Sequence, residues 1–320
     1  MNAISDTPDA RYVVTGPSGW IGSALLALLA RRLGPEWRDH VTCFGSSDRL
    51  LDHPAGVVRV RALEDIGPHD VANARVFHLA YLTKDRIGAS ADGAFVERNL
   101  AIDDLVLGAV RQGRPQAVFV ASSGAAEGAA RRTERNLYGL TKLIQEDRFL
   151  DYAAGGGAPA LVGRIFNIAG PYINKIGSYA LSSLLSQGIS TGRMTIGATV
   201  PVFRSYLDVE DLLLLILEEM SDPLDLWRGP VDLCGALVVE MADVAAAAAG
   251  ALGLDPTTAV SRGEVSLSTV SRYLGDPAPA RLLALKRGLS LRTFEDQVAR
   301  TAADLRGRLS GRSGPEASRA

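Results

Sequence analysis

Three side chains in the middle of the sequence could together move a proton and orient a substrate oxygen. Tyr138 and Lys142 are four positions apart, so a helix would place both side chains on one face, about one turn apart. A tyrosine hydroxyl titrates near ~10 when unperturbed, and a neighbouring ammonium group would stabilise its phenolate at lower pH. Ser123, 15 positions before the tyrosine, could polarise a substrate oxygen. The plainer alternative is a tyrosine that packs at a helix start beside a surface lysine.

A glycine-rich segment near the N-terminus could bind the phosphates of a dinucleotide. It reads TGPSGWIG at residues 15–22, between the β-branched run RYVVT and an apolar stretch from about Trp20 to Leu33. Its three glycines allow a tight turn, close approach of the backbone to a pyrophosphate, and close packing of helix on strand. Free amides at a helix start favour an anion. A glycine-rich turn without a ligand is the alternative.

The end of the next strand indicates which dinucleotide binds. Folds that prefer NAD usually carry an acidic residue there, against the ribose 2′-hydroxyl. Here the strand ends near Phe44, and Gly45 occupies the acidic position. We therefore predict NADP, unless Asp48 serves NAD instead or the stretch is only a solvated loop. Side chains that could donate to a 2′-phosphate follow, namely Ser46, Ser47 and Arg49.

Short apolar strands alternate with helices along the first half of the chain. This pattern indicates a parallel sheet covered on both faces, a Rossmann-type doubly wound α/β fold. Such sheets bind ligands beyond the carboxyl ends of their strands, where the segments described above occur. The expected strands are residues 11–15, 40–45, 57–60, 74–80, 116–122 and 160–166, and the expected helices are 20–33, 92–112 and 137–153.

The rhythm changes after about Phe166, which predicts two regions. Residues 11–166 form the expected NAD(P)-binding domain, and residues 167–309 form mainly a smaller α/β substrate-binding lobe, although 202–220 could return to the first domain. Residues 1–10 and 310–320 lack a buried face and are expected to be mobile tails. Within the second region we expect helices at 177–187, 209–220, 240–252 and 293–309, and strands at 193–196, 202–207 and 231–235.

Composition excludes several classes of protein. The net charge is −2 with 47% hydrophobic residues, which disfavours a disordered chain and a nucleic-acid binder. Two cysteines form no disulfide framework, and four scattered histidines show no metal-ligand spacing. The first residues do not resemble a signal peptide, and the apolar runs are shorter than the ~18 residues of a membrane span. We therefore expect a cytoplasmic protein without a metal.

These motifs together resemble the extended short-chain dehydrogenase/reductase family, the NAD(P)-dependent epimerase/dehydratase group that acts mainly on nucleotide sugars. The resemblance covers about residues 11–305. It rests on TGPSGWIG, on HLA at 78–80, on Asn99, on ASSG at 121–124, on YGLTK at 138–142, on RIFNIAGPY at 164–172 and on RSYLDVEDL at 204–212.

The resemblance implies a role for each matching residue. Ser123 and Tyr138 resemble the catalytic hydroxyls, Lys142 the cation that binds the ribose and activates the tyrosine, and Asn99 a polar residue close to the active site. Asn167 and Arg204 match positions that meet the substrate's pyrophosphate, and Arg262 matches a weaker phosphate-binding pattern. An ion pair with Asp208, Glu210 or Asp211 is the alternative for Arg204. The predicted cofactor contacts are Gly16, Ser18, Gly19, Trp20, Ile21, Gly22, Gly45, Ser46, Ser47, Arg49, Leu79, Ala80, Tyr138 and Lys142.

Departures from the family pattern narrow the reaction. Sugar 4,6-dehydratases carry Thr-Asp-Glu where this chain has Ser123-Gly124-Ala125, so dehydration is disfavoured. Relatives that epimerise at C3 and C5 use a cysteine just after the serine, and none is present here. A familiar tyrosine is replaced by Glu127. The loop at 124–137 is a candidate specificity loop whose charged residues are Glu127, Arg131, Arg132, Glu134 and Arg135.

The sequence thus predicts an NADP-dependent reductase that delivers hydride to a keto group, at C4, of a nucleotide-linked deoxysugar. An NAD-dependent nucleotide-sugar 4-epimerase would use the same serine, tyrosine and lysine. An oxidoreductase whose substrate has no nucleotide and a nonenzymatic Rossmann protein remain as further alternatives. The resemblance also implies a homodimer through the helices at 92–112 and 137–153. Apolar residues expected on their outer faces are Leu105, Val106, Ile144 and Phe149.

Overall fold

The computed structural model describes residues 10–83, 92–131 and 136–310, apart from the side chains of Asp92, Asp225 and Leu226. The chain divides into two compact units. The first comprises the chain up to Phe166 with residues 212–233 and 276–289, and the second comprises residues 167–211, 234–275 and 290 onward. The segments that return to the first unit are therefore 212–233 and 276–289, and the sequence had left open a return of 202–220.

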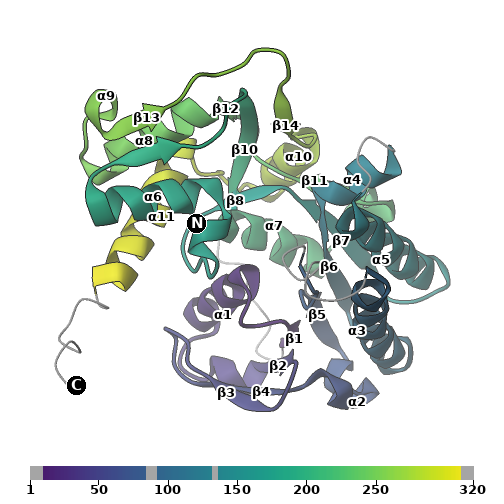
Figure 1. The fold of residues 1–320 in the computed structure, drawn as a ribbon. Helices are drawn as coiled ribbons and strands as arrows, with labels where there is room; N and C mark the ends of the chain where they lie inside the picture. The colour runs from purple at the N-terminus through teal and green to yellow at the C-terminus, as the bar shows by residue number, and fades with distance from the viewer. Residues whose placement is uncertain (1–9, 84–91, 132–135, 311–320) are drawn as a thin grey trace. The chain divides into compact units, whose positions relative to one another are not determined.

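An eight-stranded sheet forms the centre of the first unit (Figure 1). Its strands are β1 (Arg11–Thr15), β2 (Val41–Gly45), β3 (Arg49–Leu51), β4 (Val58–Ala62), β5 (Ala74–His78), β6 (Ala117–Ser123), β7 (Ala160–Ile165) and β11 (Val231–Leu233). They follow the order β11-β7-β6-β5-β1-β2-β4-β3, and only β3 and β4 pair antiparallel. The connections reverse direction between β1 and β5, which is where such sheets bind ligands. The predicted Rossmann-type class is confirmed.

Helices connect these strands and cover the sheet. They are α1 (Trp20–Leu33), α2 (Pro68–Val71), α3 (Asp92–Gly113), α4 (Gly124–Ala130), α5 (Leu137–Ala154), α7 (Val209–Ser221) and α10 (Ala278–Arg287), with 3-10 turns at Trp37–His40, Leu63–Asp65 and Asp225–Arg228. α7 begins in the second unit and belongs to the first from Leu212 onward. α3 and α5 lie side by side, and their buried residues pack with the valines of the central strands (Figure 1).

The apolar side chains of α3 and α5 divide between core and surface. Val106 and Phe149 are fully buried against the sheet, so the expectation that they lie on outer faces is wrong. Their helical positions face the core valines, which the apolar pattern alone did not reveal. Leu105 is partly buried against the same core, and Ile144 is 41% exposed.

The second unit is built around β10 (Val202–Asp208). β10 pairs in parallel with β8 (Asn167–Ala169) and β14 (Ser271–Tyr273), and antiparallel with β12 (Val238–Glu240). A separate parallel pair joins β9 (Met194–Ile196) and β13 (Val260–Arg262). The helices are α6 (Ala180–Thr191), α8 (Met241–Leu252), α9 (Pro256–Ala259) and α11 (Phe294–Ser310), with a 3-10 turn at Ile176–Ser178. α6, α8 and α11 pack against one another.

Within the described residues, no helix combines the length and apolarity that crossing a membrane requires. The same part of the chain contains no group of three histidine, cysteine or acidic side chains that could hold a metal ion. Cys43 and Cys234 are buried and form no disulfide with each other, and burial raises the pKa of Cys43 to about 12. The expected mobile tails fall mainly on residues 1–9 and 311–320, which lie outside the described residues.

Candidate active site

The glycine-rich turn after β1 forms a cradle that side chains would fill. Gly16 has a φ of 72°, and a Cβ on it would lie 2.9 Å from the backbone nitrogen of Ala80. A Cβ on Gly22 would lie 2.4 Å from the carbonyl oxygen of Gly16, so α1 packs directly on the turn. No side chain caps α1 at Gly19, and no acidic residue occurs in its first turn. Its first amides therefore fit an anionic pyrophosphate.

The other predicted contacts of this turn occupy different environments. Trp20 is buried and Ile21 is partly buried at the start of α1. Leu79 and Ala80 follow β5, and their backbone amides donate to Oγ1 of Thr15 at 3.1 and 3.0 Å. The end of β1 is thereby joined to the segment after β5, so the two backbones that flank the switch point are held together.

A guanidinium group lies at the end of β2, where an acidic residue would stand in an NAD-preferring site. β2 ends at Gly45, and Ser46 and Ser47 are exposed beyond it. Nη2 of Arg49 donates to Oγ of Ser18 at 3.0 Å, and it lies 3.9 Å from the point that a Cβ on Gly45 would occupy. A positive charge is thus fixed beside both the glycine-rich turn and the end of β2. Asp48 and Arg49 line one hollow with Leu50, Arg59, Val60, Arg61 and Asp65.

The starts of α4 and α5 bring the candidate hydroxyls into one region. Ser123 ends β6 and caps α4, where its Oγ accepts the backbone N–H of Ala125 at 3.2 Å. α5 is capped by Asn136, whose Oδ1 accepts the N–H of Gly139 at 2.5 Å. A Cβ on Gly139 would lie 2.4 Å from the carbonyl oxygen of Ala125, so the first turns of both helices touch. Tyr138, in the first turn of α5, therefore lies beside the helix that Ser123 caps.

Lys142 is buried one turn farther along α5. Its Nζ donates to the carbonyl oxygen of Ala121 at 2.7 Å and to Oε1 of Gln145 at 2.8 Å. The same atom lies 3.4 Å from the centre of the Tyr81 ring, which meets the Tyr138 ring edge-on at 6.3 Å. Lys142 is therefore not the surface lysine of the plainer alternative.

Charge and burial act in opposite directions on Lys142. Burial lowers the pKa of Lys142 to about 7, while the carboxylates of Asp103 and Glu146 favour its charged form. Glu146 is itself held by Arg164, whose Nη2 donates to it at 2.7 Å, and by Ser122, whose Oγ donates at 2.5 Å. The hydroxyl of Ser122 is thus committed to the core.

Asn99 lies on α3 and is directed at the backbone. Its Oδ1 accepts the N–H of Leu82 at 2.8 Å, and its Nδ2 donates to the carbonyl oxygen of Phe95 at 3.2 Å. The residue is fully buried. Asn99 thus fixes the segment that follows β5 and carries Tyr81.

Two of the predicted substrate contacts belong to the second unit and lie on adjacent strands. The amide of Asn167 donates to the carbonyl oxygens of Ser205 and Tyr273 at 3.2 and 3.4 Å. Arg204 donates to the carbonyl oxygen of Phe203 at 2.8 Å and to Oγ of Ser271 at 3.3 Å. Both side chains are partly exposed. Their roles toward a pyrophosphate stay predictions.

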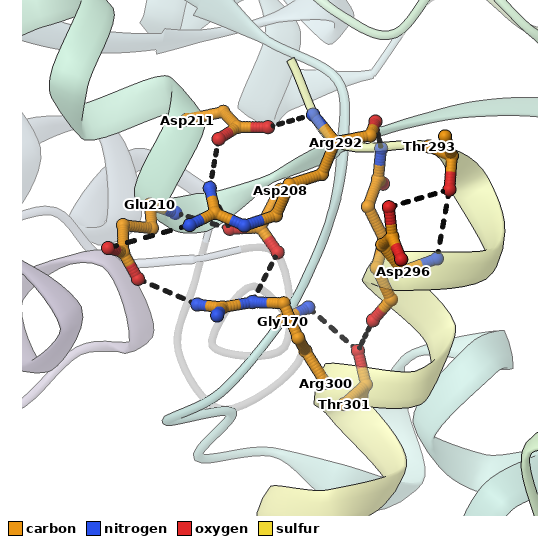
Figure 2. Close-up of polar contacts among 10 residues, drawn as sticks. Gly170, Asp208, Glu210, Asp211, Arg292, Thr293, Asp296, Arg300 and Thr301 are labelled. Carbon is orange, nitrogen blue, oxygen red and sulfur yellow. Dashed lines mark hydrogen bonds and ion pairs between the residues drawn. The ribbon is translucent and has the colours of Figure 1, made fainter. Parts of the chain in front are cut away.

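The acidic residues after Arg204 pair with other arginines. Figure 2 shows Arg292 against Asp211 and Arg300 between Asp208 and Glu210. Arg300 donates to Asp208 at 3.2 Å and to Glu210 at 2.6 Å. The alternative in which Arg204 pairs with one of these carboxylates is therefore wrong, because α11 and the turn before it supply the partners.

Arg262 is held by its own unit. Its Nη1 contacts both carboxylate oxygens of Glu240, at 2.9 and 3.1 Å, and its other nitrogens donate to the carbonyl oxygens of Ala198 and Val200. A phosphate would have to compete with these partners. The role of Arg262 in phosphate binding stays a prediction.

The candidate specificity loop begins with a short helix. α4 occupies its first part, and Glu127 pairs with Arg131 at 2.5 Å. Arg132, Glu134 and Arg135 lie outside the described residues.

One known protein family matches the part of the chain that contains the glycine-rich turn. The family described as "NAD dependent epimerase/dehydratase family" matches residues 12–223, which include the glycine-rich turn and Ser123, Tyr138 and Lys142. The chain belongs to this family. No curated protein sequence matches the chain.

Solved structures of several proteins have a similar fold. "MoeE5 in complex with UDP-glucose and NAD" is 24% identical with a TM-score of 0.69, and the match covers 94% of this chain and 100% of that one. RMD from Pseudomonas aeruginosa, complexed with NADPH, is 22% identical with a TM-score of 0.70 and coverages of 93% and 99%. A UDP-N-acetylglucosamine 4-epimerase from Methanobrevibacter ruminantium M1 is 16% identical with a TM-score of 0.72 and coverages of 94% and 99%.

The sequence did not indicate three residues that surround Lys142. Tyr81 covers Lys142, Gln145 accepts a hydrogen bond from it, and Asp103 binds Gln145. One signal was present, since Gln145 is three positions after Lys142 on the same helix. The position of Asp103 opposite Gln145 depends on how α3 packs on α5, which the sequence does not show.

Proposed function

We propose that the protein uses NADPH to reduce a keto group, at C4, of a nucleotide-linked deoxysugar. The observation that carries the choice of cofactor is the position of Arg49, hydrogen-bonded to Ser18 and beside Gly45. A guanidinium at that place can take two oxygens of a 2′-phosphate, and no carboxylate at position 45 would repel it. The family supports the nucleotide-sugar class, and among the similar solved structures MoeE5 holds UDP-glucose with NAD and RMD holds NADPH.

Tyr138, Lys142 and Ser123 would each have one role in the reduction. The bound cofactor would supply the hydride that reaches the carbonyl carbon. Tyr138 would give its hydroxyl proton to the carbonyl oxygen, and the ammonium group of Lys142 would stabilise the phenolate that results. Ser123 would donate a hydrogen bond to the same oxygen and orient it.

The residues after Ser123 support reduction over dehydration. Gly124 and Ala125 carry no carboxyl group, so neither can protonate a leaving hydroxyl or remove a proton from C5. Glu127, the first acidic residue beyond them, is paired with Arg131. The side chains in place are those that hydride and proton transfer at one carbon require.

Cofactor behaviour separates reduction from 4-epimerisation, which would use the same serine, tyrosine and lysine. We would identify bound nucleotides by mass spectrometry of gently purified protein, then follow NADPH absorbance with 4-keto nucleotide sugars. A reductase exchanges its cofactor and consumes one NADPH for each product. Tightly retained NAD⁺, with turnover of a 4-hydroxy nucleotide sugar and no added cofactor, would establish the epimerase instead.

The second unit is proposed to bind the substrate's pyrophosphate through Asn167 and Arg204. Arg204 makes only neutral hydrogen bonds, to Phe203 and Ser271, so its charge is not neutralised by a carboxylate among the described residues. Arg204→Ala should raise KM for a nucleotide sugar and leave KM for NADPH unchanged. An unchanged KM for the nucleotide sugar would show that Arg204 does not bind its pyrophosphate.

A homodimer through α3 and α5 is proposed for the assembly. Leu140 is 46% exposed and Ile144 41% exposed, one turn apart on α5. Sedimentation equilibrium at micromolar concentration should show a dimer that Ile144→Asp weakens. A monomeric wild type would contradict this assembly.

A further inference from the structure

We propose that Gln145 and Asp103 are positioning residues that hold the ammonium group of Lys142 at the active site. They act through a buried chain of hydrogen bonds that ends at Thr15, beside the glycine-rich turn. The inference rests on the proposed function only in that Lys142 serves Tyr138.

The first links of the chain run from α5 to α3. Nζ of Lys142 donates to Oε1 of Gln145 at 2.8 Å. Nε2 of Gln145 donates to Oδ1 of Asp103 at 2.7 Å. The amide at position 145 serves both links, because its oxygen accepts from the lysine while its nitrogen donates to the carboxylate.

The next links run from α3 through β5 to β1. Nε2 of His78 lies 2.9 Å from the same Oδ1 of Asp103, and Nδ1 of His78 lies 3.1 Å from Oγ1 of Thr15. Thr15 Oγ1 already accepts the N–H groups of Leu79 and Ala80, so its own hydrogen is the one that it can share with Nδ1. This count assigns the imidazole proton to Nε2, which donates to Asp103.

Every side chain in the chain is withdrawn from solvent. Thr15 and Asp103 are 0% exposed, His78 and Gln145 1%, and Lys142 3%. Oδ2 of Asp103 has no hydrogen-bond partner within the described residues, and Nη1 of Arg148 is 3.8 Å from it. Burying a carboxylate costs folding free energy unless hydrogen bonds or an opposite charge stabilise it. The ammonium group of Lys142 is such an opposite charge, and the amide of Gln145 links it to Asp103.

Other charged groups also lie around Lys142 and Asp103 and contribute to the electrostatic environment of the lysine. Burial opposes the charge on Lys142, and the two carboxylates favour it. The titratable and charged groups packed around Lys142 and Asp103 are His78 on β5, Tyr81 beyond β5, Tyr138, Glu146 and Arg148 on α5, and Arg164 on β7. Asp103 is the group that Lys142 reaches through a neutral side chain, so its effect can be changed at Gln145 without changing a charge.

The test is the titration of Lys142 in the protein without substrate. The chain has four lysines, Lys84, Lys142, Lys175 and Lys286, so labelling with lysine carrying ¹³C at Cε gives four NMR signals. The signal lost in Lys142→Arg identifies residue 142. Its midpoint is then measured in three variants: Gln145→Met, Gln145→Glu and Asp103→Asn.

The expected shifts differ in sign. Gln145→Met removes the acceptor from the charged form, so the midpoint falls. Asp103→Asn keeps an oxygen that can accept both hydrogen bonds but removes the charge, so the midpoint falls by roughly one pH unit. Gln145→Glu adds a negative charge, so it rises by about as much. The alkaline limb of kcat/KM should move in the same direction in each variant.

Asp104→Asn is the matched control, because Asp104 is adjacent on α3, is 66% exposed and pairs with Arg148 at the surface. The proposal is overturned if the Lys142 midpoint is unmoved in both Gln145 variants, or if Asp104→Asn moves it as far as Asp103→Asn. Circular dichroism checks that each variant folds, and the two Gln145 variants decide the matter if Asp103→Asn does not. Midpoints that shift as expected in a protein inactive on nucleotide sugars would refute the proposed function alone.

Discussion

The ammonium nitrogen of Lys142 lies 3.4 Å from the centre of the Tyr81 ring, and that ring meets Tyr138 edge-on. Tyr81 thus contacts both groups that would control the proton. The face of an aromatic ring attracts a cation, most strongly where water is excluded. The contact therefore favours the charged form of Lys142 against the effect of its burial.

Two substitutions of Tyr81 should distinguish the effect of its ring from the effect of its hydroxyl. Burial raises the pKa of Tyr81 far above its usual range, and its hydroxyl has no partner within the described residues, so Tyr81→Phe should leave turnover and stability almost unchanged. Tyr81→Leu removes a buried cation–π contact of about 2 kcal/mol, so turnover should fall by roughly tenfold or more. Single-turnover kinetics measures this. Equal activity in both variants would show that the ring does not support Lys142.

Loss of either proton-handling side chain should stop the chemistry and leave the fold. Tyr138→Phe and Lys142→Ala should each lower turnover at least ~10²-fold, because general acid–base catalysis contributes that much. Ser123→Ala should also lower turnover. Ser122→Ala is its matched control, because Ser122 bonds to Glu146 in the core and should mainly lower thermal stability. A folded Tyr138→Phe enzyme with wild-type turnover would refute the mechanism.

Sequence reasoning succeeded where one local pattern determines the structure. The apolar helix expected at 20–33 is α1, with the same limits, because a strand, a glycine turn and an apolar run follow in order. The epimerase/dehydratase family matches residues 12–223, which include the motifs around Tyr138. The helix and the motifs could be predicted because each depends on residues that are close together in the sequence.

Features that depend on packing between distant segments could not be predicted. Val106 was placed on an outer face because the apolar pattern does not give the rotation of α3 against the sheet. The sequence did not indicate the ion pair of Arg262 with Glu240, because the pairing of β9 with β13 sets Arg262 among the carbonyl groups of 198 and 200. The contact of Asp103 with Gln145 joins residues 42 positions apart.

The ion pair of Glu240 with Arg262 should give the second unit a distinct acid dependence. Burial alone would raise the pKa of Glu240, but hydrogen bonds from Arg262 and from the amides of Val202 and Ala242 lower it to about 2. A carboxyl whose folded pKa lies below its unfolded value of ~4.5 stabilises the fold above that value. This stability is lost as the pH falls through the folded pKa.

Glu240→Gln should therefore reduce stability at pH 7 and flatten its dependence between about pH 4.5 and 2. The loss is at most about 1.4 kcal/mol for each pKa unit, lessened by solvent screening. Urea unfolding over this pH range measures it. Glu264→Gln, at an exposed position on the same unit, is the control. Parallel pH curves for wild type and Glu240→Gln would contradict the assignment.

Arg49 should set the preference for NADPH over NADH. Its guanidinium is held by Ser18 beside Gly45, where it can meet a 2′-phosphate. A charge-assisted contact contributes about 1.5 to 3 kcal/mol, which corresponds to a preference of roughly 10- to 100-fold. Arg49→Ala should remove most of this preference by weakening NADPH binding and leaving NADH binding nearly unchanged. Calorimetric titration of the apoprotein with both cofactors, at one ionic strength, gives both affinities.

Arg59→Ala is the charge-matched control, because Arg59 lines the same hollow but has no hydrogen bond to Ser18. A similar loss in both variants would mean that the general positive charge of the hollow, rather than the placed guanidinium, attracts the phosphate. Tighter binding of NADH by the wild type would show that Asp48 reaches the ribose instead. The NADP assignment would then fail, and the 4-epimerase would become the better explanation of the site.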